Sequence, residues 1–261
     1  MSNRIIMLIV WIILNCIPAL FVTVAVHELG HLTAGKMSGY RPVYLKILFL
    51  AFYRKGQERS VRIEKGSCFG QCIMIPELRH GAEYEKESNN PEKLVLGGCL
   101  FNLSAALLFC FLHFIIPTEG IQGDFFRLFF LETSIINLII CSYNLFGASE
   151  TSDGSTFREL IKRRENVEAY NSLMLVYAGL LNGDRLDEMD DSLFWACSVS
   201  SSLLAELTLM SCKREAMKQK PGIISDRLYE RFKIIADCDY DFAAGEARYY
   251  LEKYGEGQVN G

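Results

Sequence analysis

An uninterrupted apolar run near the start of the chain constrains its fold most. Residues 5–26 form 22 consecutive positions without a charged side chain. About 20 apolar residues in a helix cross the ~30 Å hydrocarbon core of a bilayer, so this run predicts a transmembrane helix. A signal peptide is the alternative. It requires a positive leader and a shorter apolar core, whereas here only Arg4 precedes a run that leads directly into His27 and Glu28. We therefore favour the membrane helix.

Two further apolar segments predict additional spans. Residues 94–116 form a clear one, and residues 125–146 form a second that contains Arg127 and Glu132 near its start. A charged side chain near a helix end can extend towards water, while one further inside usually faces protein. Residues 117–124 form a predicted loop between these spans. The expected fold is a mainly α membrane protein with three transmembrane helices.

Basic residues predict how the chain crosses the membrane. The segment between the first two spans contains eleven of them, and Lys162, Arg163 and Arg164 follow the third span. Lysine and arginine accumulate in cytoplasmic loops. We therefore expect a multi-pass protein of the cell membrane, with the N-terminus outside and the C-terminal part in the cytoplasm. The eleven residues are Lys36, Arg41, Lys46, Arg54, Lys55, Arg59, Arg62, Lys65, Arg79, Lys86 and Lys93.

The loop and the C-terminal part differ in their patterns. Residues 44–53 and 70–75 are rich in β-branched and aromatic side chains, which predicts short strands in a membrane-associated loop. Beyond the third span the pattern becomes helical, over residues 165–181, 191–218, 226–238 and 241–254. We therefore predict a transmembrane core at residues 1–157 and a soluble helical module at residues 158–261.

Charge and cysteine content exclude some classes of function. The net charge is −4, with acidic and basic residues nearly balanced, so no nucleic-acid partner is expected. The nine cysteines are an odd number and several lie in apolar stretches, which predicts free thiols in a reducing compartment. Cys68 and Cys72 have no second pair or nearby histidine to complete a zinc site.

The strongest chemical signal is the motif at His27, Glu28, Leu29, Gly30 and His31. In a helix, side chains four residues apart lie on one face, so both histidines can bind one Zn²⁺. Glu28 lies beside that face and can act as general base towards a zinc-activated water that attacks a peptide carbonyl. Ionisable residues in a membrane helix are functional candidates, because burying them without a partner is costly.

A catalytic zinc site requires a third protein ligand. Asp153 is our preferred candidate, because it follows the third span on the same predicted side as His31. Glu150 is its competitor, and an N-terminal helix cap is the structural alternative for Asp153. His113 lies near the opposite end of the second span, and His80 lies in a polar loop, so we expect packing and surface roles for them.

Taken with the motif at His27 to His31, two further segments resemble the site-2 protease family of intramembrane zinc metalloproteases, peptidase family M50. Asn144 to Gly154 is similar to the family's Asn-Pro-x-x-Asp-Gly segment, although it contains no proline. Gly98 to Asn102 is similar to the family's Gly-x-x-x-Asn element near the active site.

The resemblance covers residues 5–157 and implies a three-helix core. It also implies that Asp153 is the third zinc ligand and that Asn102 faces the zinc, where it positions substrate or stabilises the developing oxyanion. The strand-rich loop corresponds to the family's β element, which presents an extended substrate at a sheet edge.

We therefore predict a zinc endopeptidase that cleaves a membrane protein or a hydrophobic peptide within the lipid bilayer. The alternative is a non-proteolytic zinc-binding membrane protein that acts as a binding or immunity module through its C-terminal helices. Glu28 argues against it, because zinc binding alone needs the ligands and not the general base. The C-terminal helices leave room for a cytoplasmic protein partner in either case.

Overall fold

The structure is a computed structural model of the full chain. It describes residues 3–65, 68–77, 90–117, 120–147, 149–150, 152–219 and 224–258. The chain divides into two compact units, Met1–Ser155 and Thr156–Gly261. The roles that we assign to residues 1–157 and 158–261, as a protease core and a cytoplasmic module, stay predictions.

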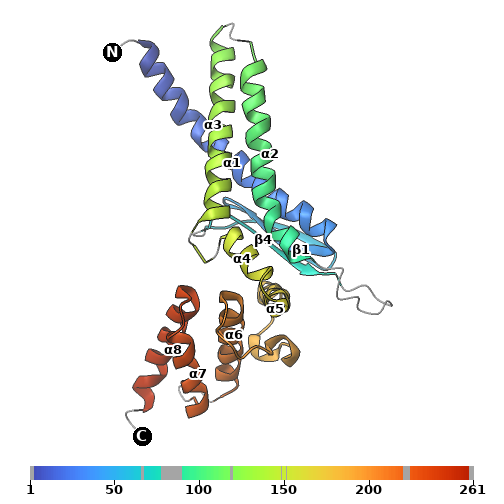
Figure 1. Ribbon diagram of the computed structural model, residues 1–261, viewed down its shortest axis with the longest axis vertical. Helices are drawn as coiled ribbons and strands as arrows, with labels where there is room; N and C mark the ends of the chain where they lie inside the picture. Colours follow the sequence, from blue (N-terminus) through green and yellow to red (C-terminus); the bar gives the residue numbers. More distant parts are fainter. Residues whose placement is uncertain are drawn as a thin grey trace. The chain divides into compact units, whose positions relative to one another are not determined.

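Three long helices dominate the first unit and pack against one another (Figure 1). They are α1 (Asn3–Met37), α2 (Pro91–Ile115) and α3 (Gly120–Phe146). Each is long and apolar enough to cross a membrane. Many of their large apolar side chains, such as Ile17, Leu107 and Ile139, are exposed. Exposed apolar surface of this extent is typical of helices that face lipid. The prediction of a mainly helical protein with three helices able to span a membrane is confirmed.

The helix bounds differ from the predicted ones at two places. The first span was predicted to end at Val26, but α1 continues through the motif to Met37. At 1.5 Å per residue this helix is about 52 Å long, well above the ~30 Å of a bilayer core. The predicted loop at 117–124 is also shorter, because α3 already begins at Gly120. An apolar run marks the part of a helix that can cross the membrane. It does not mark the residue at which the helical hydrogen bonds end.

A four-stranded antiparallel sheet follows α1, with strand order β3-β2-β1-β4. The predicted strand at 44–53 is wrong as one element, because it contains a hairpin that turns at Leu48 and Phe49. Leu48 has φ 53°, a conformation that favours glycine or asparagine, so the turn carries no sequence signal. The strands are β1 (Tyr40–Ile47), β2 (Leu50–Lys55), β3 (Glu58–Ile63) and β4 (Gly70–Pro76).

Strand β4 begins beside the motif and runs along α1 towards the C-terminal end of that helix. A side chain added at Gly35, near the end of α1, would meet the sulfur of Met74. One added at Gly70 would meet the carboxylate of Glu28. The N-terminal end of β4 therefore lies beside the motif. β4 is also an edge strand of the sheet within the described residues.

The second unit is helical. Its predicted helix at 191–218 is wrong in extent, because the chain forms only a short 3₁₀ turn at Asp191–Phe194 before α6 begins at Ser202. Ser201 caps α6 by accepting a hydrogen bond from the backbone N–H of Leu204 (3.2 Å). The main helices are α5 (Arg164–Leu181), α6 (Ser202–Lys218), α7 (Asp226–Ala236) and α8 (Asp241–Gln258).

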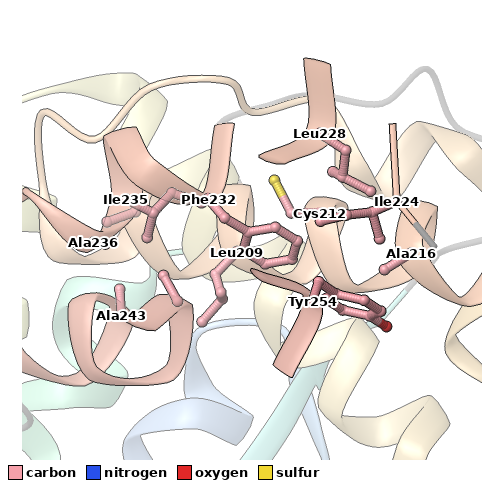
Figure 2. Close-up of a cluster of buried hydrophobic side chains, with 12 residues drawn as sticks. Leu209, Cys212, Ala216, Ile224, Leu228, Phe232, Ile235, Ala236, Ala243 and Tyr254 are labelled. Carbon is pink, nitrogen blue, oxygen red and sulfur yellow. The ribbon is translucent and has the colours of Figure 1, made fainter. Parts of the chain in front are cut away.

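Helices α6, α7 and α8 enclose an apolar core (Figure 2). Phe232 of α7 is fully buried there, in a cluster that also contains Leu209 of α6 and Tyr254 of α8. Its ring stacks on that of Tyr250, with centroids 5.2 Å apart. Burial of an aromatic side chain of this size is among the larger single contributions to the stability of a small unit.

Candidate metal centre

His27 and His31 lie one turn apart on α1, as their spacing predicts. Both side chains are buried. Their Nε2 atoms are 3.1 Å apart and their ring centroids 4.7 Å apart. The two nitrogens therefore converge on one point rather than pairing with separate partners.

Asp153 brings a carboxylate to the same point. Its Oδ2 lies 3.1 Å from Nε2 of His27 and 3.4 Å from Nε2 of His31. One ligand atom from each of the three residues lies within 4.8 Å of the others, and among the described residues this group contains Asp153 and not Glu150. Asp153 lies 126 positions after His27 in the sequence, so the fold brings these three side chains together.

The local structure explains why Asp153 is available. It opens α4 (Asp153–Leu160), but Ser152 supplies a cap, accepting a hydrogen bond from the backbone N–H of Ser155 (3.3 Å). Gly154 packs so closely on the carbonyl of Leu145 that a side chain would not fit. These contacts hold the segment against the end of α3 and leave the Asp153 carboxylate for the histidines.

The charge of Asp153 also suits a ligand. Burial alone would raise the pKa of this carboxyl group, but hydrogen bonds and charge interactions with His27 and His31 outweigh burial and hold the pKa well below its ordinary value. The group is therefore an ionised carboxylate at neutral pH.

Two imidazole nitrogens and a carboxylate oxygen form a donor set that catalytic zinc sites use, with a further position left open. The convergence of the three side chains and the buried setting fit a zinc ion. They would hold it through Nε2 of His27, Nε2 of His31 and the carboxylate of Asp153.

Glu28 lies next to this group and is only 4% exposed. One carboxylate oxygen packs against Gly70 of β4. The other, Oε2, is buried and has no hydrogen-bond partner among the described residues. A buried oxygen without a partner is costly, and catalytic groups are one of the known causes.

Asn102 of α2 is fully buried at the same site. Its Nδ2 lies 3.2 Å from Nδ1 of His27. The structure thus places the predicted residue beside a candidate ligand. Its predicted role towards substrate stays a prediction.

Sequence reasoning missed several contributors on α2 and β4. Nδ1 of His31 donates a hydrogen bond to the carbonyl of Leu94 (2.9 Å), and the thiol of Cys99 lies 3.6 Å from Oδ2 of Asp153. Gly98 was noted only as part of a motif, and Gly70 only as a strand end. No signal in the sequence identifies a backbone carbonyl or a missing side chain as part of a site.

The remaining histidines lie elsewhere. Nδ1 of His113 donates to the carbonyl of Arg127 (2.9 Å), and the Arg127 side chain donates back to the carbonyl of His113 (3.1 Å). These bonds join α2 to α3. They also provide hydrogen-bond partners for Arg127, one of the charged residues in the third span. His80 falls outside the described residues.

Comparison with known proteins gives one match. The family model described as peptidase family M50 matches residues 15–233, which include every residue of the candidate site. No curated protein and no solved structure matches the chain. Members of the family are zinc metalloproteases that act in membranes. Because the match covers most of the sequence, the chain belongs to peptidase family M50.

Proposed function

We propose that this chain is an intramembrane zinc endopeptidase that hydrolyses a peptide bond of a membrane-embedded or hydrophobic peptide substrate. The observation that carries the proposal is the convergence of His27, His31 and Asp153 beside the buried carboxylate of Glu28. Zinc, when bound there, supplies a Lewis acid that polarises a carbonyl and makes water more acidic.

Glu28 then performs the proton transfers. Its Oε2 has no hydrogen-bond partner in the described part of the chain, so it can accept a proton from the attacking water as the water oxygen bonds to the substrate carbonyl carbon. When the C–N bond breaks, the same carboxyl group returns the proton to the leaving amine. One residue thus acts first as general base and then as general acid, and ends in its starting state.

Strand β4 provides a place for the substrate. A helical substrate must unwind before its carbonyl can be attacked, because the helix hydrogen bonds shield it. An extended segment can pair with β4, which is an edge strand among the described residues, as peptides do at other sheet edges. Because Gly70 at one end of β4 packs on Glu28, such a segment would pass directly beside the carboxylate.

The exposed apolar side chains at this end of the sheet suit a hydrophobic substrate. Phe49 at the hairpin turn, Ile63 at the end of β3 and Phe69 before β4 are all exposed. The backbone N–H of Leu48 donates to the carbonyl of Phe69 (2.6 Å), which joins these segments at the tip. We propose that the tip lies in the membrane beside the site. The basic residues around it favour a cytoplasmic origin for the loop, with the C-terminal helices on the same side.

The test compares full-length wild type with three variants, Glu28→Gln, Asp153→Ala and Glu150→Ala, each purified in detergent. We expect Glu28→Gln to keep the zinc content of wild type but to lose roughly 100-fold or more in cleavage of co-expressed membrane peptides. Asp153→Ala should lose zinc, and Glu150→Ala should keep both zinc and cleavage. Unchanged cleavage by Glu28→Gln would refute the protease assignment and favour the binding module.

A further inference from the structure

Helix α2 presents one group to each candidate zinc ligand. The carbonyl of Leu94 accepts from Nδ1 of His31, the thiol of Cys99 lies at Oδ2 of Asp153, and the amide of Asn102 lies at Nδ1 of His27. Leu94, Gly98 and Asn102 recur every four residues and therefore share one face of the helix. That face is turned towards the site.

Gly98 allows this close approach. A Cβ atom at this position would lie 2.5 Å from Nε2 of His31 and 2.6 Å from Cε1 of His27. Both imidazole rings therefore lie directly on the backbone of α2. With no side chain between them, Leu94 and Asn102, one turn to either side, reach the Nδ1 atoms.

The contact at His27 has a chemical requirement. A neutral histidine that binds a metal through Nε2 carries its proton on Nδ1, so Nδ1 is a donor and needs an acceptor. Leu94 provides the acceptor for His31. At His27 the neighbouring group is a carboxamide, and only its oxygen can accept.

Asn102 has a carboxamide oxygen that can accept this hydrogen bond. Its Oδ1 is buried and has no hydrogen-bond partner within the residues that the structure describes, while Nδ2 is the atom that faces Nδ1 of His27. A half-turn of the carboxamide exchanges the two atoms without moving the rest of the side chain. Oδ1 then accepts from Nδ1–H of His27, and the buried oxygen gains a partner.

We propose that Asn102 is a positioning residue for His27, which holds the imidazole as the tautomer that binds zinc through Nε2. This inference rests on the proposed zinc site and assigns α2 as the element that orients it. The half-turn leaves the amide N–H group free, so a role as donor to substrate is a separate property of the same residue.

The test measures zinc affinity of the full-length protein in detergent by competition with a chelator. Asn102→Leu removes both functions of the amide, whereas Asn102→Asp keeps an acceptor for Nδ1–H and loses the donor. We expect Asn102→Leu to bind zinc roughly 10- to 100-fold more weakly than wild type, the usual loss when an outer partner of a ligand is removed. Asn102→Asp should restore affinity to within about threefold of wild type, and the visible spectrum of its Co²⁺ form should match that of wild type.

Asn137→Leu is the matched control. Asn137 is another fully buried asparagine of the helix bundle, and its amide donates to Thr23 Oγ1 (2.9 Å) and to the carbonyl of Thr133 (2.8 Å). It should bind zinc as wild type does. The proposal is overturned if Asn102→Leu binds zinc normally, if Asn102→Asp is as weak as Asn102→Leu, or if Asn137→Leu is equally weak. A wild-type protein that binds zinc but cleaves nothing would refute the proposed protease and leave this inference standing.

Discussion

At the scale of single residues, the position of Glu28 depends on a residue that has no side chain. Its carboxylate packs on Gly70, and the space that a methyl group would need at Gly70 is already occupied by the carboxylate. The proposed general base is therefore held from two directions, by α1, to which it belongs, and by β4. A small change in β4 should move the base without touching the candidate metal ligands.

We therefore predict that Gly70→Ala separates metal binding from catalysis. The added methyl group would displace the Glu28 carboxylate, and misplacing a catalytic group by about 1 Å can cost roughly 100-fold in rate. Zinc affinity should stay near that of wild type, because the three atoms nearest to the added methyl group all belong to Glu28. Parallel assays of zinc affinity and peptide cleavage measure both effects.

Gln71→Ala is the control for this change, since Gln71 is the next residue of β4 and its side chain is exposed. It should cleave as wild type does. Equal losses in both variants would show that the strand as a whole is sensitive and that the contact between Gly70 and Glu28 has no special role.

The same residues show what the sequence could predict of the site. His27, Glu28 and His31 share one helix turn, so their spacing alone brings them together. Asp153 depended on the predicted spans and on the family resemblance, because it lies far away in the sequence. Leu94 contributes a backbone carbonyl, and Gly70 and Gly98 contribute the absence of a side chain. Such contributions depend on packing between elements and leave no pattern along the chain.

At the scale of elements, the close packing of α1 on α2 positions the candidate ligands His27 and His31 against their partners on α2. A Cβ atom at Gly97 would lie 2.5 Å from the carbonyl oxygen of Gly30 and 2.7 Å from the Cβ of Ala34. Gly30 lies within the motif, one residue before His31. Small residues that let two helix backbones approach are a common packing device in membranes.

We expect Gly97→Val to push the two helices apart. Overpacking of this kind costs about 1–3 kcal/mol, and here it should also weaken zinc binding, because Leu94 and Asn102 would withdraw from His31 and His27. Thermal unfolding in detergent and chelator competition test the two effects. Leu100→Val, on the exposed side of α2, controls for a β-branched residue in the helix. Normal zinc affinity in Gly97→Val would show that the site tolerates separation of α1 and α2.

Elements were predictable where one physical signal dominated. A helix needs about 20 apolar residues to cross a bilayer, and all three helices contain a run of that kind. This requirement is strong enough to predict them from the sequence. The sheet was predicted only in part. Strand β3 carries charged side chains along an exposed edge and lacks apolar alternation, so it gave no signal. The hairpin at Leu48 was hidden because neither turn residue is of the kind that favours a turn.

At the scale of the whole molecule, the chain combines two units with separate cores. All candidate site residues lie in Met1–Ser155, while Phe232 and its cluster lie in Thr156–Gly261. The chain's two tryptophans divide in the same way, with Trp11 in α1 and Trp195 in the second unit. Trp195 donates a hydrogen bond to Ser172 Oγ (3.2 Å), so its fluorescence should report the folding of that unit.

Phe232→Ala should therefore unfold the second unit and leave the metal site intact. Removing a fully buried phenylalanine costs about 3–5 kcal/mol, a large share of the stability of a small domain. In a Trp11→Phe background, the unfolding transition reported by Trp195 should shift to lower temperature, while zinc affinity stays unchanged. Tyr249→Ala, at an exposed position of α8, is the control and should shift the transition little.

The cleavage rate of Phe232→Ala then decides what the second unit contributes. If the unit recruits or positions a substrate, cleavage falls although zinc affinity is normal, because the chemistry at Glu28 needs a bound peptide as well as a formed site. If cleavage is unchanged, the first unit is sufficient for catalysis and the helical unit acts elsewhere. A loss of zinc affinity would contradict both, since it would mean that the ligands in the first unit depend on the core around Phe232 for their arrangement.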